Sequence, residues 1–189
     1  GSGSKHRANA PLFSCKDSYA VYGIEGGRML VKAIIQDIRN RINDKEGVGD
    51  FDDDEIVSYI NQAINYIGLY FVGSGNPIAI KDVVIRNGDT LPNDYIKTCG
   101  ILPIKITGKT IKFLDTGVKD YTMKYFYKAP NITGAENEEM PYDDTVTNNV
   151  IVTLTVILLM NQQRLNVSQD QGLNSSLMDI IESAYSARA

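Results

Sequence analysis

Two amphipathic segments in tandem near the start of the chain constrain its fold most. The first, residues 29–43, repeats an aliphatic side chain at every fourth position, and the second, residues 52–71, does so after an acidic start. Spacing of this kind predicts two helices, each with one apolar face that must be buried. The predicted buried seam consists of Leu30, Ile34, Ile38, Ile56, Ile60, Ile64 and Ile67.

The segment between these helices reads as a short loop. Gly47 and Gly49 prevent either helix from continuing through it. The carboxylates of residues 52–55 suit the positive N-terminal end of the second helix, where free N–H groups need acceptors. A short loop between two amphipathic helices predicts an antiparallel helical hairpin.

From residue 78 the pattern changes from helical to extended. Residues 78–86 are rich in β-branched side chains and end at an Asn-Gly turn, and residues 101–107 and 110–114 flank a tight Gly108-Lys109 turn. Residues 121–127 alternate in part between their two sides. Residues 78–128 are therefore expected to form a small antiparallel β-sheet of four strands, followed by an exposed acidic loop at 133–141.

The C-terminal third returns to helix. Residues 143–166 are β-branched but too long for a strand, so we expect a helix with an aspartate cap. Residues 172–188 form a second amphipathic segment after Gly172. The predicted fold class is α+β and mainly helical, in the order α-α-β-β-β-β-α-α. The inserted sheet interrupts one domain of residues 29–189.

Residues 1–28 differ from the rest of the chain. Residues 1–4 have linker composition, and Ile24-Glu-Gly-Gly-Arg28 is close to a protease-recognition spacer placed before Met29. We expect residues 1–28 to be an added leader or a flexible extension and Met29 to be the natural start.

The charge of the chain is acidic once this leader is set aside. The leader holds four of the 19 Lys and Arg and two of the 23 Asp and Glu, which leaves 15 basic and 21 acidic residues in 29–189. Without a basic run such a chain is poorly suited to grip DNA phosphates, but it suits a surface past which DNA slides. The apolar run 150–160 would span only about 16 Å as a helix, so no membrane span is expected.

Catalytic chemistry has few candidate residues. The one histidine, His6, lies in the expected leader, and Cys15 and Cys99 match no metal-binding spacing. We therefore expect no catalytic, metal or cofactor-binding residues and no cofactor. The acidic cluster 52–55 is interpreted as a solvated helix cap, and the cluster 136–144 as a solvated loop or a contact with a neighbouring subunit. A metal site is the alternative for both. The aromatic strand 121–127 is interpreted as sheet packing, with single-stranded nucleic-acid binding as the alternative.

Three parts of the chain together resemble a known family. They are the opening helix 29–43, the acidic-capped helix with Tyr59-Ile60-Asn61-Gln62-Ala63, and the Leu91-Pro92-Asn93-Asp94-Tyr95 element after a strand. This arrangement is similar to the head-to-tail adaptor, or connector, proteins in the neck of tailed bacteriophages. The last element is similar to the subset of those proteins that carries a β-rich insertion.

The resemblance implies a structural virion protein and no enzyme. Such subunits form a homo-oligomeric ring of about twelve copies beneath the portal protein, at the head–tail junction. The ring assembles in the host cytoplasm, extends the channel through which genomic DNA passes without sequence-specific binding, and offers an attachment face to tail or nozzle proteins. By position in the family, the portal-docking segment would include Leu173, Leu177, Ile180, Ile181 and Tyr185.

Other functions remain open on the sequence. One is a different neck component, such as a stopper or tail-completion protein. Another is a small metal-dependent nuclease or hydrolase that uses the acidic clusters. A third is a host-encoded interaction module.

Overall fold

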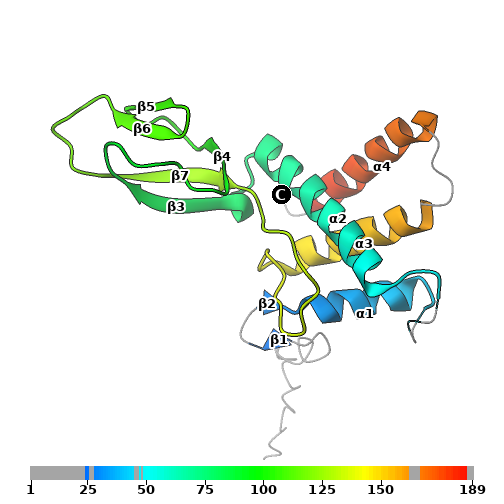
Figure 1. The fold of residues 1–189 in the computed structure, drawn as a ribbon. Coiled ribbons are helices and arrows are strands. Elements are labelled where there is room, and N and C mark those ends of the chain that lie inside the picture. The colour runs from blue at the N-terminus through cyan, green and yellow to red at the C-terminus, as the bar shows by residue number, and fades with distance from the viewer. Residues whose placement is uncertain (1–23, 26–27, 45–46, 48, 162–166, 187–189) are drawn as a thin grey trace, which may run out of the picture.

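The chain folds into a helical body from which a β-rich arm projects (Figure 1). The computed structural model describes residues 24–25, 28–44, 47, 49–161 and 167–186, with the side chains of 24–25 and 167–174 excepted. The arm is inserted between the second and third helices, and two small antiparallel sheets build it. The fold is α+β, as predicted.

Among the described residues, four helices make the body: α1 (Val31–Arg41), α2 (Asp53–Ser74), α3 (Thr145–Asn161) and α4 (Val167–Ser186). Helix α3 lies at the centre and packs against the other three. It is therefore buried around most of its circumference, which explains why its sequence lacks a one-sided apolar pattern. The predicted start of the last helix at 172 is wrong, because α4 begins at Val167 and Gly172 lies inside it. A glycine in a helix interior is only about 1 kcal/mol less favourable than an alanine, so it does not stop the helix.

The predicted seam of the first two helices lies in this core. Ile34 and Ile38 of α1 and the four isoleucines of α2 are buried, while Leu30 precedes α1 and is half-buried. Both helices pack mainly against α3. The seam of the hairpin is thus covered chiefly by the third helix.

The start of α1 is joined to the segment that precedes α3. The Val31 N–H donates to the Glu138 carbonyl (2.8 Å), and the Met140 N–H donates to the Met29 carbonyl (2.8 Å). A short ribbon, β1 (Ile24–Glu25) with β2 (Arg28–Met29), lies directly before α1. Residues 1–23, the larger part of the expected leader, lie outside the described residues.

The arm contains five strands: β3 (Ile80–Ile85), β4 (Tyr95–Thr98), β5 (Ile104–Thr107), β6 (Thr110–Phe113) and β7 (Tyr121–Tyr127). A single turn of 3-10 helix, η2 (Pro77–Ala79), leads into β3. The order β3-β7-β4 makes one antiparallel sheet, and β5 pairs with β6 in a hairpin. Strand β4 was not predicted, because four residues that follow a turn are too few to show a strand period.

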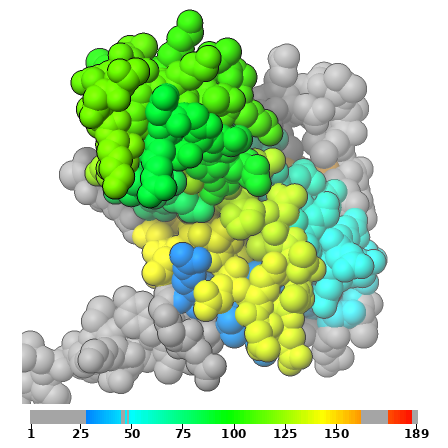
Figure 2. Space-filling view, turned by 60° about the vertical axis from the view of Figure 1, so that its left-hand side comes forward, coloured from blue at the N-terminus to red at the C-terminus, as the bar shows by residue number. Residues whose placement is uncertain are grey.

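The hairpin covers one face of the three-stranded sheet. The rings of Phe113 and Tyr121 meet edge to face at 4.7 Å, and Ile111 and Met123 are fully buried. In the space-filling view the arm is a green lobe beside the yellow and cyan surface of the helical body (Figure 2). The arm thus has an apolar core of its own.

No helix among the described residues has both the length and the apolar character needed to cross a bilayer.

Candidate assembly surfaces

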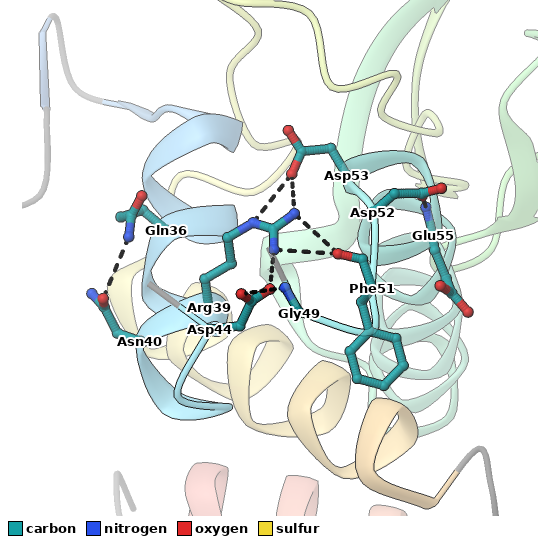
Figure 3. A network of polar contacts seen from close by, with 9 residues as sticks. All are labelled: Gln36, Arg39, Asn40, Asp44, Gly49, Phe51, Asp52, Asp53 and Glu55. Atoms are coloured by element: carbon teal, nitrogen blue, oxygen red, sulfur yellow. Dashed lines mark hydrogen bonds and ion pairs between the residues drawn. The ribbon is translucent and has the colours of Figure 1, made fainter. Parts of the chain in front are cut away.

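A buried arginine organises the loop between α1 and α2 (Figure 3). Arg39 is only 6% exposed, and an arginine buried to this degree needs acceptors for its five N–H groups. It pairs with Asp44, donates to Asp53 through Nε (3.2 Å) and Nη2 (2.5 Å), and donates to the Phe51 carbonyl from both Nη atoms (3.3 Å). One guanidinium therefore fixes three points of the loop.

The end of α1 brings Asp44 onto this arginine. The Asp44 N–H donates to the Arg39 carbonyl (2.8 Å) and the Asn43 N–H to the Asn40 carbonyl (3.3 Å), which is the Schellman pattern. Asn43 takes the left-handed conformation that this motif needs, with φ at 60°. The Asp44 carboxylate accepts from the Gly49 N–H at 2.8 Å, so one hydrogen bond joins the two ends of the loop.

The acidic residues at the start of α2 have different roles. Asp52 is the N-cap and accepts from the Glu55 N–H (2.8 Å), whereas Asp53 serves Arg39. Asp50 and Asp54 are exposed, and no ion pair involves them within the described residues. The predicted capping role therefore holds for Asp52, and the Asp50 and Asp54 carboxylates face outward.

Beside this loop lies a hollow of about 430 Å³, here called the acidic hollow. Aliphatic and aromatic side chains from the end of α1, the loop before α2 and the end of α3 line it together with two carboxylates. Met160 is 59% exposed although it is apolar. Its lining includes Ile42, Asp44, Asp50, Phe51, Leu159 and Met160.

The β5–β6 hairpin of the arm carries the opposite charge. Lys105 and Lys112 stand directly opposite each other in register, Lys109 lies at the turn, and all three are exposed. Residues 104–113 contain no acidic side chain. Like charges in a directly opposed pair destabilise a hairpin, so this arrangement is unfavourable unless an anionic surface faces it.

The Leu91-Pro92-Asn93-Asp94-Tyr95 element forms the root of the arm. Asp94 accepts from Lys81 Nζ (2.8 Å) and from the Tyr125 hydroxyl (3.0 Å), and its carbonyl accepts from the Lys128 N–H (2.7 Å). Burial alone would raise the pKa of Asp94, but the bonds from Lys81 and Tyr125 outweigh it and hold the pKa below its ordinary value. Burial and the bond to Asp94 raise the pKa of Tyr125 to about 12.

The second acidic cluster also serves the fold. The Glu138 carboxylate accepts from the N–H groups of Thr133, Gly134 and Ala135 at 2.7 to 3.2 Å, and these bonds organise the exposed acidic loop. Asp144 accepts from the Thr147 N–H (2.9 Å) and is the predicted cap of α3. Glu136, Glu139 and Asp143 are exposed.

The predicted portal-docking side chains of α4 lie mostly inward. Leu177 and Ile181 are fully buried, Ile180 is half-buried, and Tyr185 stacks on Tyr70 with ring centroids 5.5 Å apart. The side chain of Leu173 lies outside the described residues. Docking through this face stays a prediction, and it now requires α4 to leave the core.

The aromatic strand is used for packing. Tyr125, Phe126 and Tyr127 are buried, and Lys124 is exposed on the face opposite the hairpin. Buried rings cannot stack on bases, so this strand fits the interpretation as sheet core. Within the part of the chain that the structure describes, no three His, Cys, Asp or Glu side chains are grouped so that they could hold a metal ion.

Comparison with known proteins finds no matching family and no matching curated sequence.

Proposed function

We propose that this chain is a structural subunit of the neck of a tailed bacteriophage, an adaptor that forms a ring beneath the portal and offers a face to the tail. In this role DNA passes through the ring without sequence-specific binding. The proposal rests on the family resemblance of the sequence and on the architecture of the subunit.

The arm is the observation that carries the proposal. It stands away from the helical body (Figure 1). It also exposes apolar side chains that its own core does not use. Ile101 is fully exposed, Leu114 is 68% exposed and Val84 is 60% exposed. Exposed apolar side chains gathered on one projecting element are typical of surfaces that are covered in an assembly.

The roles of the carboxylates also favour a structural protein. Asp52 and Asp144 cap helices, Asp53 binds Arg39, and Glu138 holds a loop. These are the side chains that a metal-dependent nuclease would need for its cations. Each of these carboxylates has a structural role in the fold, so catalysis is not needed to explain its presence.

A portal-binding experiment tests the proposal. We would mix the purified chain with portal rings of the phage that encodes it, sediment the mixture, and image the pellet by electron microscopy. An adaptor adds a closed ring of many copies to the tail-side face of the portal. In a phage with a stop codon early in this gene, DNA-filled heads without tails should accumulate. Tailed, infectious particles from that mutant would refute the proposal.

A further inference from the structure

The two parts of the subunit carry opposite charge. Residues 78–128, which include the arm, contain nine Lys and Arg against five Asp and Glu. The remainder of residues 29–189 contains six against 16. The overall acidity of the chain thus conceals a basic arm on an acidic helical body.

The β5–β6 hairpin carries three of the basic residues of the arm. Lys105, Lys109 and Lys112 have no ion pair with any described residue. Two exposed apolar side chains, Ile101 before β5 and Leu114 after β6, flank the lysines. The hairpin therefore offers cations together with aliphatic side chains.

The acidic hollow offers the complementary combination. Ile42, Phe51, Leu159 and Met160 provide apolar lining, and Asp50 lies beside them with Asp54 exposed at the nearby start of α2. The Arg39 network holds the Phe51 backbone and Asp44 in place before any partner arrives. A preorganised surface loses little entropy on binding.

The hairpin and the hollow cannot meet within one subunit. The arm projects from one side of the helical body, whereas the loop between α1 and α2 lies on the opposite side (Figure 1). Two complementary surfaces on opposite sides of a chain join copies head to tail, and such contacts close into a ring when the rotation allows.

We infer that the β5–β6 hairpin of one copy docks on the acidic hollow of the next copy. This inference rests on the proposed function, because it supplies the contact between neighbours in the ring. Duplex DNA is the competing partner for the lysines. It is less suitable because Ile101 and Leu114 have no counterpart in a phosphate backbone, and the acidic body would repel it.

Charge reversal on each surface tests the contact. One variant carries Lys105→Glu with Lys112→Glu, and the other carries Asp50→Lys with Asp54→Lys. Sedimentation velocity at low ionic strength measures self-association, and circular dichroism checks that each variant keeps its helices. We expect each variant alone to associate at least about tenfold more weakly than the unchanged chain, since like charges then face each other. An equimolar mixture should associate again, because each altered surface then meets its complement.

Matched controls carry the same change of charge elsewhere. Lys97→Glu with Lys124→Glu alters the opposite face of the arm, and Asp179→Lys with Glu182→Lys alters the exposed side of α4. Both should associate like the unchanged chain.

Several results would overturn the inference. They are an unchanged chain that stays monomeric at low salt, a mixture that stays dissociated, or controls that fail equally. A lysine variant that loses binding to a short duplex DNA while its self-association is unchanged would assign the hairpin to DNA.

Portal sedimentation separates the two proposals. If the charge-reversed variants still form rings on portals, the inference fails and the function stands. If association follows the charges but portals bind nothing, the proposed function fails.

Discussion

At the scale of single residues, charged side chains organise the loop beside the acidic hollow and the root of the arm. Arg39 holds the loop beside the acidic hollow, and Asp94 joins Lys81 of β3 to Tyr125 of β7 at the root of the arm. In each case a polar side chain connects segments that apolar contacts alone would leave loosely oriented. Their removal should therefore be felt in stability as well as in assembly.

Replacement of Arg39 by Met should destabilise the fold strongly. The change removes the guanidinium that pairs with the Asp44 carboxylate, whose side chain is 9% exposed, and that donates to the Phe51 carbonyl. Loss of one partner from a buried pair costs about 3 kcal/mol or more, measured as the free energy of unfolding in urea. Arg41→Met removes an exposed pair with Asp37 and should cost less than about 1 kcal/mol. Equal losses in both variants would contradict the assigned role of Arg39.

Asp94 should make the arm sensitive to acid. Its pKa in the folded chain lies below the ordinary value of 3.8, so the folded state binds fewer protons than the unfolded chain in that range. This stability is present above the ordinary pKa and is lost as the pH falls through the folded value. The free energy of unfolding should thus fall more steeply below about pH 5 in the unchanged chain than in Asp94→Asn. Asp82→Asn on the neighbouring strand serves as the control and should keep the steep fall.

At the scale of elements, α3 and α4 complete the core that the first two helices begin. Helix α3 is buried against all three partners, and α4 adds Leu177, Ile181 and Tyr185 to the same core. The Tyr185 hydroxyl also lies 2.6 Å from the Thr147 hydroxyl near the start of α3. The last helix is therefore an integral part of the folded body as well as a predicted docking segment.

Truncation of side chains on α4 should distinguish these two roles. Leu177→Ala leaves a cavity in the core and should cost about 2–5 kcal/mol of unfolding free energy. Ile180→Ala, at a half-buried position of the same helix, should cost about 1 kcal/mol. Thermal unfolding followed by circular dichroism compares the two variants. A Leu177→Ala chain as stable as the unchanged one would mean that α4 does not stabilise the body.

At the scale of the whole molecule, the acidic body and the basic arm give the subunit two sides of opposite charge. Acidic side chains that serve the fold lie on the body, and the lysine hairpin lies on the arm. The same division bears on the alternative of a metal-dependent enzyme. Carboxylates already engaged by backbone N–H groups and by Arg39 are poorly available to a cation.

Addition of Mg²⁺ or Mn²⁺ should leave the melting temperature essentially unchanged. A site that binds a cation only in the folded state would stabilise the chain by about 2.7 kcal/mol at a concentration one hundred times its Kd. Scanning fluorimetry across millimolar concentrations measures the shift, with Ca²⁺ as a comparison. A saturable rise in melting temperature that Asp53→Asn or Glu138→Gln removes would favour the nuclease or hydrolase alternative.

Local pattern determined much of the fold. The spacing of apolar residues and the positions of turn residues predict both helices of the hairpin, the third helix, the β insertion and the α+β class. Each of these depends on neighbours within a few residues. The caps at Asp52 and Asp144 follow from the same local logic. The start of α4 and the strand β4 were not predicted, because Gly172 does not interrupt the helix and four residues after a turn are too few to show a strand period.

Only the tertiary structure decided which charges are used inside the subunit and which are left for a partner. In the sequence, the four acids of 52–55 look alike, and so do the nine cations of the β insertion. Folding brings Asp53 to Arg39 and Asp94 to Lys81, while Asp54 and the hairpin lysines stay exposed. The reason is that charge pairing depends on distance in space, and residues far apart along a chain acquire that distance only when the core has formed.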